Sequence, residues 1–547
     1  MKLIYLLILS AAAFSAEAQR VLKGSVLDQN RDPLTGVNIL VKGGSNGTVS
    51  DENGAYSISI QPNEKVLVFS YTGFTTQEVS VGTSNTLDIV LVEGVQLSEM
   101  VVTALGISRE KKELGYAIEE IKGEQLQRVG ESDPLRAMQG KIAGVNIVGS
   151  SSQPGSATRL TIRGLKSFFG NNQALYVVDG IPFDASTNGA SFQLTGGGAY
   201  SNRLADLDPN NIESINVLKG ATAAALYGSR ASRGVIIINT KTGSLKKGDN
   251  RLSVDVSSSI NFEKIASLPN YQNTYGNGTG FIYAQANGSW GAPFPGAVPY
   301  PTIDSINHWY RGAGYTASFN RLVEAGDPRV TSKVPYQAYP DNVKDVFNTG
   351  SLRDNSVTIR GGNQNTSMAM TFSRVNHTGI FPNSDFGKTS FSLGANSKFE
   401  TGLRVGGNFS FINSLQKGLQ GGAIGSASTA SFMARTLYLG RAWDLQGQPF
   451  EDPVTHESLF MVSRASADNP LWSSKYNGFS GDVNRYVVNV NAGYQFNKWL
   501  DLDYRIGINQ YNQRDLEWFR PGSQGAGGLG SVVDLNTNFR ELESTVI

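Results

Sequence analysis

The side chains that could support catalysis or bind a metal are few and widely spaced. The three histidines are His308, His377 and His456, and none stands in a metal-ligand spacing such as His-Glu-x-x-His. No Gly-x-Ser-x-Gly segment supplies a nucleophilic serine. The absence of cysteine excludes zinc–thiolate sites, iron–sulfur clusters, disulfides and thiol nucleophiles. We therefore expect no metal and no other cofactor.

One cluster of acidic residues remains as a candidate for catalysis. Asp444, Glu451 and Asp452 lie close together in the sequence, and a pair of carboxylates is what glycoside hydrolysis requires. All three fall in a predicted loop, where a solvated surface is the favoured interpretation. The sequence therefore predicts a protein that is not an enzyme.

Composition narrows the class of protein further. The 547 residues carry 47 basic and 46 acidic side chains, for a net charge of +1. This balance argues against a nucleic-acid partner, which favours a clearly basic surface. The 62 glycines and an aromatic content of 10% suit a bacterial β-barrel, and they suit an extracellular β-solenoid equally well.

The first 18 residues have the pattern of a secretory signal peptide. Lys2 supplies the positive charge, Leu3 to Phe14 form a short apolar core, and Ala16 and Ala18 fit the small-x-small cleavage pattern. The apolar run is too short to span a membrane, and no later stretch is long and apolar enough for a transmembrane helix. If the mature protein lies in a membrane, we expect it to do so as a barrel.

Residues 19–94 predict a small β-sandwich, because short β-rich runs alternate with turn clusters. The runs are Val21–Leu27, Val37–Val41, Tyr56–Ile60, Val66–Tyr71 and Leu87–Val92. Residues 95–112 follow as a linker. Its β-prone segment Leu97–Ala104, with no partner strand beside it, could add to the edge of another protein's sheet. An ordinary linker or a last strand of the sandwich is the alternative.

Residues 113–243 predict a mixed α+β domain. Asp133 can cap a helix that starts at Pro134. Strands are expected at Gly144–Val148, Leu160–Gly164, Leu175–Gly180, Ile212–Leu218 and Gly234–Thr240. The last of these has a fully apolar middle and is therefore expected to be buried on both faces.

Residues 250–547 predict strands of about ten residues that are apolar on one face and polar on the other, as in transmembrane barrels. Tight turns alternate with long loops, which indicates periplasmic turns and extracellular loops. A soluble sandwich is the alternative. The eight expected strands are Leu252–Phe262, Ser356–Arg360, Ser367–Val375, Ser390–Phe399, Leu403–Ile412, Tyr486–Phe496, Trp499–Ile508 and Val532–Phe539.

Two regions resemble known families. The pattern Gly24-x-Val26-x-Asp28, followed by Gly54-x-Tyr56, resembles the carboxypeptidase-regulatory-like domain. The middle region resembles the plug of TonB-dependent outer-membrane transporters, specifically of the SusC/RagA family. That resemblance is carried by Leu105–Tyr116, Gly140–Val145, Ile162–Gly164, Leu175–Pro182 and Asn211–Lys241.

The resemblance implies a mainly β protein: a transthyretin-like sandwich, an α+β plug, and the first eight or so strands of a 22-stranded barrel, truncated at Ile547. It implies a TonB box made of Leu97, Ser98, Glu99, Met100, Val101, Val102, Thr103 and Ala104. The matching plug-motif residues are Arg163, Gly164, Asp179, Gly180, Lys219, Gly220, Tyr227, Gly228, Arg230 and Gly234.

The charged plug residues are candidates for a wet, ion-paired contact between plug and barrel, with ordinary solvated surface as the alternative. They are Arg159, Arg163, Asp179, Glu213, Lys219, Arg230 and Arg233. Exposed ion pairs of this kind contribute little each, which would suit a plug that must move.

The implied function is TonB-dependent import of a glycan oligosaccharide or peptide across the outer membrane, with a SusD-like surface lipoprotein as lid. Trp290, Trp309 and Tyr310 could stack on that substrate or on the lid, or could pack their loop on itself. A siderophore or vitamin receptor of the same architecture is one alternative function. A surface β-structural protein or adhesin without transport is the other.

Overall fold

The structure is a computed structural model and describes residues 20–42, 46–61, 66–92, 100–102, 108–110, 118–127, 130–168, 172–187, 197–219, 227–242, 252–299, 302–312, 314–363, 365–421, 429–497 and 499–546. The predicted signal peptide lies outside these residues. Contacts divide the chain into two units, residues 1–100 with 110–112, and residues 101–109 with 113–547.

The first unit is a β-sandwich, as its alternating sequence predicts. One sheet has the order β4-β1-β7 and the other β3-β2-β5-β6. The inward side chains form an apolar core that includes Leu22, Ile39, Ile58 and Phe69. The strands are β1 (Arg20–Leu27), β2 (Asn38–Val41), β3 (Gly47–Val49), β4 (Ala55–Ile60), β5 (Val66–Ser70), β6 (Gln77–Ser80) and β7 (Ile89–Val90).

Two short strands follow. β8 (Met100–Val102) and β9 (Ser108–Glu110) form a two-stranded sheet. The β-prone segment of the linker therefore does have a partner strand, which the sequence did not reveal because β9 is only three residues long and highly charged. Residues 97–99 and 103–104 of that segment lie outside the described residues.

The middle domain, residues 118–242, is built on a five-stranded sheet of order β10-β15-β16-β13-β14. β16 is buried over its apolar residues Val235–Ile238, as predicted. Asp133 accepts the backbone N–H of Leu135 at 2.9 Å and so caps helix α3. The elements are β10 (Ile118–Lys122), α2 (Gly123–Gln127), α3 (Pro134–Ala137), β11 (Val145–Gly149), β12 (Thr158–Ile162), β13 (Leu175–Val178), β14 (Ile181–Pro182), η4 (Arg203–Asp206), η5 (Pro209–Asn211), β15 (Ile212–Leu218), η6 (Ser229–Ala231) and β16 (Val235–Thr240).

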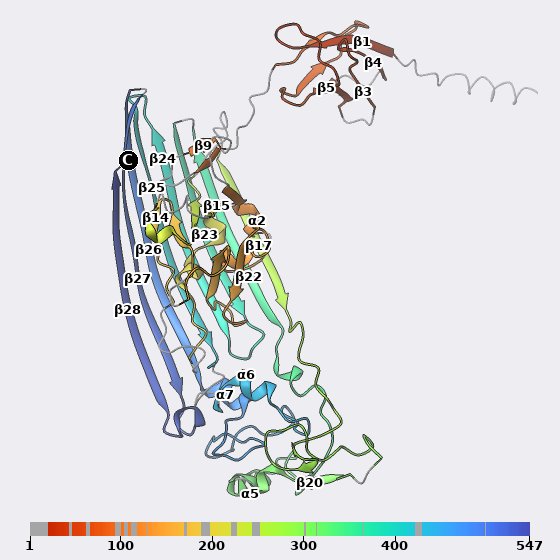
Figure 1. Cartoon of the computed structure of the whole chain (residues 1–547), viewed down its shortest axis with the longest axis vertical. Helices are drawn as coiled ribbons and strands as arrows, with labels where there is room; N and C mark the ends of the chain where they lie inside the picture. Colours follow the sequence, from red (N-terminus) through yellow and green to blue (C-terminus); the bar gives the residue numbers. More distant parts are fainter. Residues whose placement is uncertain are drawn as a thin grey trace, which may run out of the picture. The chain divides into compact units, whose positions relative to one another are not determined.

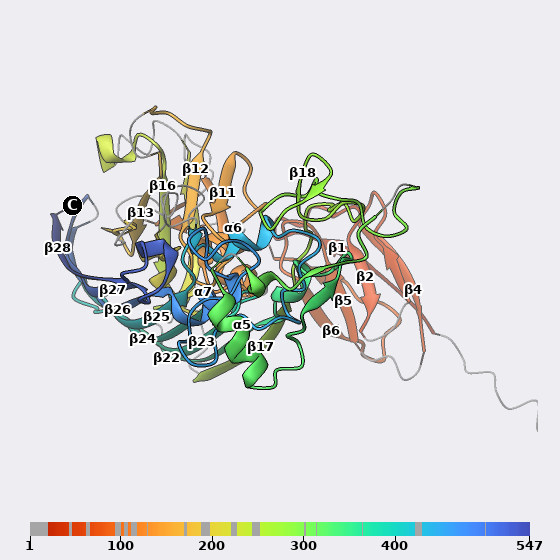
Figure 2. The same cartoon turned by 90° about the horizontal axis from the view of Figure 1, so that it is seen from below.

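The C-terminal strands form one antiparallel sheet of eight strands in sequence order, here called the wall sheet (Figure 1). It is curved, and the middle domain lies on its concave side (Figure 2). The strands are β17 (Ser253–Glu263), β22 (Gly350–Gly362), β23 (Thr366–Thr378), β24 (Asp385–Lys398), β25 (Leu403–Gly418), β26 (Gly478–Asn497), β27 (Leu500–Phe519) and β28 (Ser531–Val546).

All eight expected strands exist, but most extend beyond their predicted bounds. β26 and β27 have 20 residues each, where about ten were expected. In β22 to β27 most of the added residues lie on the loop side of the sheet, where the outward face turns polar, whereas β28 gains residues 540–546 on the side of the tight turns. None of the helices in the described ranges is both long and apolar enough to cross a membrane.

The two longest connections pack against each other to form a loop layer, residues 264–349 and 419–477. Its apolar core includes Trp309, Tyr310, Trp443 and Phe460. The layer lies at the end of the wall sheet away from the tight turns (Figure 1). Its elements are β18 (Gly278–Thr279), β19 (Ile282–Tyr283), β20 (Ser305–Asn307), η7 (Trp309–Arg311), α5 (Thr316–Glu324), β21 (Lys333–Pro335), η8 (Lys344–Val346), α6 (Phe432–Leu437) and α7 (Pro470–Tyr476). A further turn, η10 (Gln524–Ala526), joins β27 to β28.

Candidate functional site: the contact between the middle domain and the wall sheet

Residues 198–211 of the middle domain, here called the docking segment, are buried throughout although many are polar. They turn through η4 and η5 and face the polar side of the wall strands. Because buried polar groups are costly unless they are hydrogen-bonded, the partners of this segment determine how the two parts hold together.

The Asp208 carboxylate is bound by two wall hydroxyls. Ser373 on β23 and Ser390 on β24 both donate to its Oδ2, at 2.7 and 2.6 Å. Its other oxygen accepts the backbone N–H of Asn210 at 3.0 Å and caps η5. The amide of Asn210 donates to Asp354 on β22 at 2.9 Å. One short turn thus contacts three adjacent strands.

Lys388 on β24 is fully buried and points into the middle domain. Its ammonium donates to the carbonyls of Ser132 and Ala205, both at 3.0 Å, and of Leu207 at 2.7 Å. Three acceptors use all three N–H groups of an ammonium. Two of these carbonyls belong to the docking segment, so the ammonium of Lys388 helps to hold that segment in a single position.

Gln416 on β25 completes the same pattern with a neutral side chain. Its amide nitrogen donates to the carbonyls of Pro154 and Ala199, at 2.8 and 2.9 Å, and its oxygen accepts the N–H of Ser201 at 2.8 Å. Gln153 of the middle domain makes reciprocal bonds with the backbone of Leu419, at 3.1 and 2.8 Å.

Arg485 on β26 contributes the one fully buried ion pair across the contact among the described residues. Its guanidinium donates to the Arg203 carbonyl at 3.1 Å and to Asp206 at 3.2 Å, and both charged side chains are at most 1% exposed. The guanidinium carbon lies 3.6 Å from the centre of the Phe183 ring, which is a cation–π distance.

Asp179 fixes the conformation of the loop after β13, and its backbone carbonyl bonds the wall sheet. Its carboxylate accepts the backbone N–H and the hydroxyl of Thr240, each at 2.8 Å. Its φ of 49° and the 87° of Gly180 form a left-handed turn, which Asp and Gly tolerate best. The Asp179 carbonyl accepts the amide of Asn489 on β26 at 2.6 Å.

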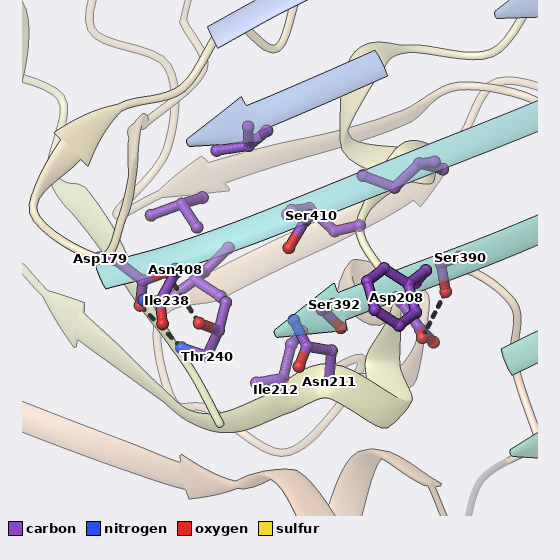
Figure 3. A pocket seen from close by; sticks show the side chains of 15 residues that line it. Asp179, Asp208, Asn211, Ile212, Ile238, Thr240, Ser390, Ser392, Asn408 and Ser410 are labelled. Carbon is purple, nitrogen blue, oxygen red and sulfur yellow. Dashed lines mark hydrogen bonds between the residues drawn. The ribbon is translucent and has the colours of Figure 1, made fainter. Parts of the chain in front are cut away.

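A small cavity lies between these contacts (Figure 3). Its volume is about 30 Å³, and its lining is mixed, with Ile212 and Ile238 beside Asp179, Asp208 and Thr240. Space of this size holds a water molecule but no nutrient.

The comparisons with known proteins fit this arrangement. Residues 110–235 match the TonB-dependent Receptor Plug Domain, and residues 22–102 match the CarboxypepD_reg-like domain. The TonB-dependent receptor SusC of Bacteroides thetaiotaomicron is 28% identical over 520 residues, covering 92% of this chain and 46% of the relative. Together these matches support a TonB-dependent transporter of the SusC/RagA family.

Other matches agree with that assignment. The TonB-dependent receptor P39 of Formosa agariphila is 34% identical over 264 residues, 48% of this chain and 23% of the relative. The structure of the RagAB peptide importer in its open-open state has the same fold, with a TM-score of 0.56 at 20% identity over 77% of this chain and 43% of that one. The chain spans about half the length of SusC. Like its family, it is an outer-membrane protein, and the middle domain is its plug.

The predicted plug-motif residues divide into two groups. Asp179 and Gly180 lie at the contact with the wall, whereas the others shape the plug itself or its exposed surface. Lys219 pairs with Glu119 inside the plug at 2.6 Å, and Gly234 has a φ of 100°. Arg163, Gly164, Gly228 and Arg230 are exposed, Tyr227 is partly buried, and Gly220 lies outside the described residues.

The ion-paired contact expected from the plug's charged residues accounts for little of the described contact. Within the described residues, Glu213 is the member of that set that forms an ion pair with the wall, with Arg360 at 3.6 Å. Buried hydrogen bonds from other residues make the contact instead. The inward side chains of the wall strands are polar and face the polar docking segment. The two therefore satisfy each other's hydrogen-bonding groups directly, without water.

The loop aromatics need a second correction. Trp309 and Tyr310 are 2% and 0% exposed, so they pack the loop layer and have no surface for a substrate or lid. The Tyr310 hydroxyl donates to the Pro449 carbonyl at 2.5 Å. Trp290 is 58% exposed and lies 5.4 Å from the Tyr275 ring, so it stays a candidate contact.

The side chains considered for chemistry have structural roles. Asp452 is buried in an ion pair with Arg321, rather than solvated as expected, and Glu451 pairs with Lys475 at 2.9 Å. His377 pairs with Glu263 at 3.0 Å on the wall. Within the described ranges, no three His, Asp or Glu side chains gather as a metal site.

Proposed function

We propose that this chain is the plug-bearing part of a transporter that imports a glycan oligosaccharide or peptide across the outer membrane, with energy delivered through TonB. The observation that carries the proposal is the plug itself, a compact domain seated on the polar concave side of a membrane-type sheet by buried hydrogen bonds. A protein that only adhered to a surface would have no need to seal its lumen with a separate domain.

The mechanism follows from what holds the plug. Hydrogen bonds to charged groups contribute about 1.5–3 kcal/mol each when buried, so the seal is firm while it is dry. A force on the segment that precedes the plug needs to break only one plug–wall hydrogen bond at a time, and water then replaces each lost partner. Once the plug has moved, the polar inward face of the wall sheet lines a hydrated path.

TonB engagement is assigned to Leu97–Ala104. Strand addition depends on main-chain hydrogen bonds and makes loose demands on side chains. Met100–Val102 already pair as a strand with Ser108–Glu110, which supports a β conformation for the segment. TonB would extend this pairing or replace it.

Deletion of Leu97–Ala104 from the full-length protein tests the proposal. Uptake should be lost, while surface binding of the sugar or peptide that supports growth stays at the wild-type level. Val101→Pro, which removes a backbone N–H, should reproduce the loss, whereas Val101→Thr should not. Undiminished uptake in the deletion strain would rule out TonB coupling.

The substrate class and the lid lipoprotein are the finer part of this proposal, which the likeness to SusC and to the RagAB peptide importer supports, and they need their own test. Growth on a panel of oligosaccharides and peptides should depend on this gene for one class only. A SusD-like lipoprotein encoded beside it should co-purify with the tagged transporter. Dependence of growth on a siderophore or vitamin instead would favour the other receptor class.

A further inference from the structure

The outward face of the wall sheet contains a row of aromatic side chains in register. Phe372, Phe391, Phe411 and Tyr486 occupy directly paired positions on β23, β24, β25 and β26. Rows of aromatic rings mark the membrane–water boundary of outer-membrane barrels. On the side toward the tight turns, the outward residues are apolar, among them Leu393, Phe409 and Val490.

The distance to the opposite boundary supports this assignment. Phe496 and Trp499 lie at the tight turn after β26 and are 57% and 82% exposed. From Tyr486 to Phe496 the strand advances ten residues, roughly 34 Å at about 3.4 Å each. A tilt of about 40° reduces this to ~26 Å, close to the ~25 Å apolar band of such barrels. The row at Tyr486 is therefore the boundary on the loop-layer side.

Beyond the aromatic row the outward face of β23, β24 and β25 is mostly polar for three further rows, with Leu415 as an apolar exception. There a cleft of about 330 Å³ lies across β23, β24 and β25. It is here called the rim cleft. Its outward lining is Arg374, Asn376, Thr378, Asp385, Gly387, Asn413, Leu415 and Lys417. Gly387 opens it, because a Cβ there would lie 3.6 Å from the Arg374 guanidinium and longer side chains would fill the space.

Neither cation of the rim cleft forms an ion pair within 4.0 Å in the described part of the chain, although Asp385 is the cross-strand neighbour of Lys417. Arg374 bonds only neutral groups, the amide oxygen of Asn376 at 3.2 Å and the Thr389 hydroxyl, and Lys417 has no ion pair within 4.0 Å. By contrast Arg514, an outward cation on β27 in the register row of Gly387, pairs with Asp534 at 2.8 Å.

We propose that the rim cleft binds the phosphate-bearing sugar headgroup of an outer-leaflet glycolipid. The two unpaired cations meet the phosphate, with Arg374 able to donate two parallel hydrogen bonds. Asp385, which would repel a free anion, accepts hydrogen bonds from sugar hydroxyls. The acyl chains extend over the apolar outward face, which begins one row below Arg374 at Phe372.

The test uses the full-length protein in detergent and a fluorescent lipid A that carries its phosphates. Arg374→Gln and Lys417→Gln should each weaken binding on the order of tenfold, because each removes one charged hydrogen-bond donor. Gly387→Leu should abolish binding by filling the cleft while leaving both charges in place. Arg514→Gln is the matched control and should bind as the wild type does.

Two further binding measurements and a folding control complete the test. Enzymatically dephosphorylated lipid A should bind poorly, and inorganic phosphate alone should not compete. Equal binding by all four variants, or an equal loss in Arg514→Gln, would overturn the assignment, as would competition by free phosphate. Heat-modified mobility of each variant on a gel shows that the barrel is folded, so loss of binding cannot come from unfolding.

Discussion

At the scale of single residues, whether a wall side chain can hold the plug depends on the face of the sheet from which it projects. Lys388 and Lys417 differ in this respect. Both are lysines of neighbouring wall strands, but Lys388 points inward and is fully buried, whereas Lys417 points outward and is exposed. Only the first can bind the docking segment.

Replacement of Lys388 by Met should loosen the plug. Three buried carbonyls would lose their donor, and each buried acceptor left unsatisfied costs about 1–3 kcal/mol. Amide hydrogen exchange in residues 203–211 should accelerate, while exchange in the N-terminal sandwich stays unchanged. Lys417→Met is the control and should leave both regions unaffected. Unchanged exchange in Lys388→Met would contradict the role given to this lysine.

A second residue-scale prediction concerns the left-handed turn at Asp179. Asp179→Ala loses both bonds to Thr240 and places a residue that disfavours positive φ, whereas Asp179→Asn keeps an acceptor and tolerates this conformation. Ala should destabilise the plug by about 2 kcal/mol more than Asn. Trypsin protection of the plug in detergent measures the difference, and equal protection of the two variants would count against the turn's importance.

At the scale of elements, the sequence predicted the presence of every wall strand but not their lengths. The alternation of apolar and polar residues ends where the outward side chains no longer face lipid. The remaining residues of each strand are mostly polar, and their sequence is typical of a loop. The sequence pattern therefore predicts a strand that starts at Tyr486, whereas β26 begins at Gly478. The docking segment was missed for a related reason, since its polar residues resemble an exposed loop until their wall partners are known.

The loop layer should respond to pH through Asp468. Burial raises the pKa of this carboxyl to about 6, against opposing hydrogen bonds from Ser523 and the Gln524 N–H. Because the folded pKa lies above the ordinary value, the stabilisation is present below pH ~4 and is lost as pH rises through about 6, by an amount of about 2–3 kcal/mol.

Asp468→Asn should remove that dependence. An amide resembles the protonated carboxyl, so the variant should be more stable than the wild type at pH 8 and similar to it at pH 4. Hydrogen exchange of residues 465–477 at the two pH values measures this. A wild-type loop layer that is equally protected at pH 5 and pH 8 would show that Asp468 is not the titrating group.

At the scale of the whole molecule, the chain combines a barrel-type sheet, a plug seated on its inner side and a strand-forming segment before the plug. The family could be identified from motifs such as Leu175–Pro182 because they are long and ordered. The contact that makes the plug a seal could not, because it depends on residues such as Asp208 and Ser390, whose hydrogen bond joins positions 182 residues apart in sequence.

The central claim is that transport requires the plug to move against the wall, and a reversible crosslink tests it directly. A Cβ at Gly507 on β27 would lie 2.5 Å from Cγ1 of Ile181 on β14, so the two Cβ atoms are within ~4 Å, the range of a disulfide. The chain has no cysteine of its own to complicate the result. Oxidised Ile181→Cys/Gly507→Cys should bind substrate at the cell surface but import none, and reduction should restore import, with both single variants active throughout. Normal import by the fully crosslinked protein would contradict the account.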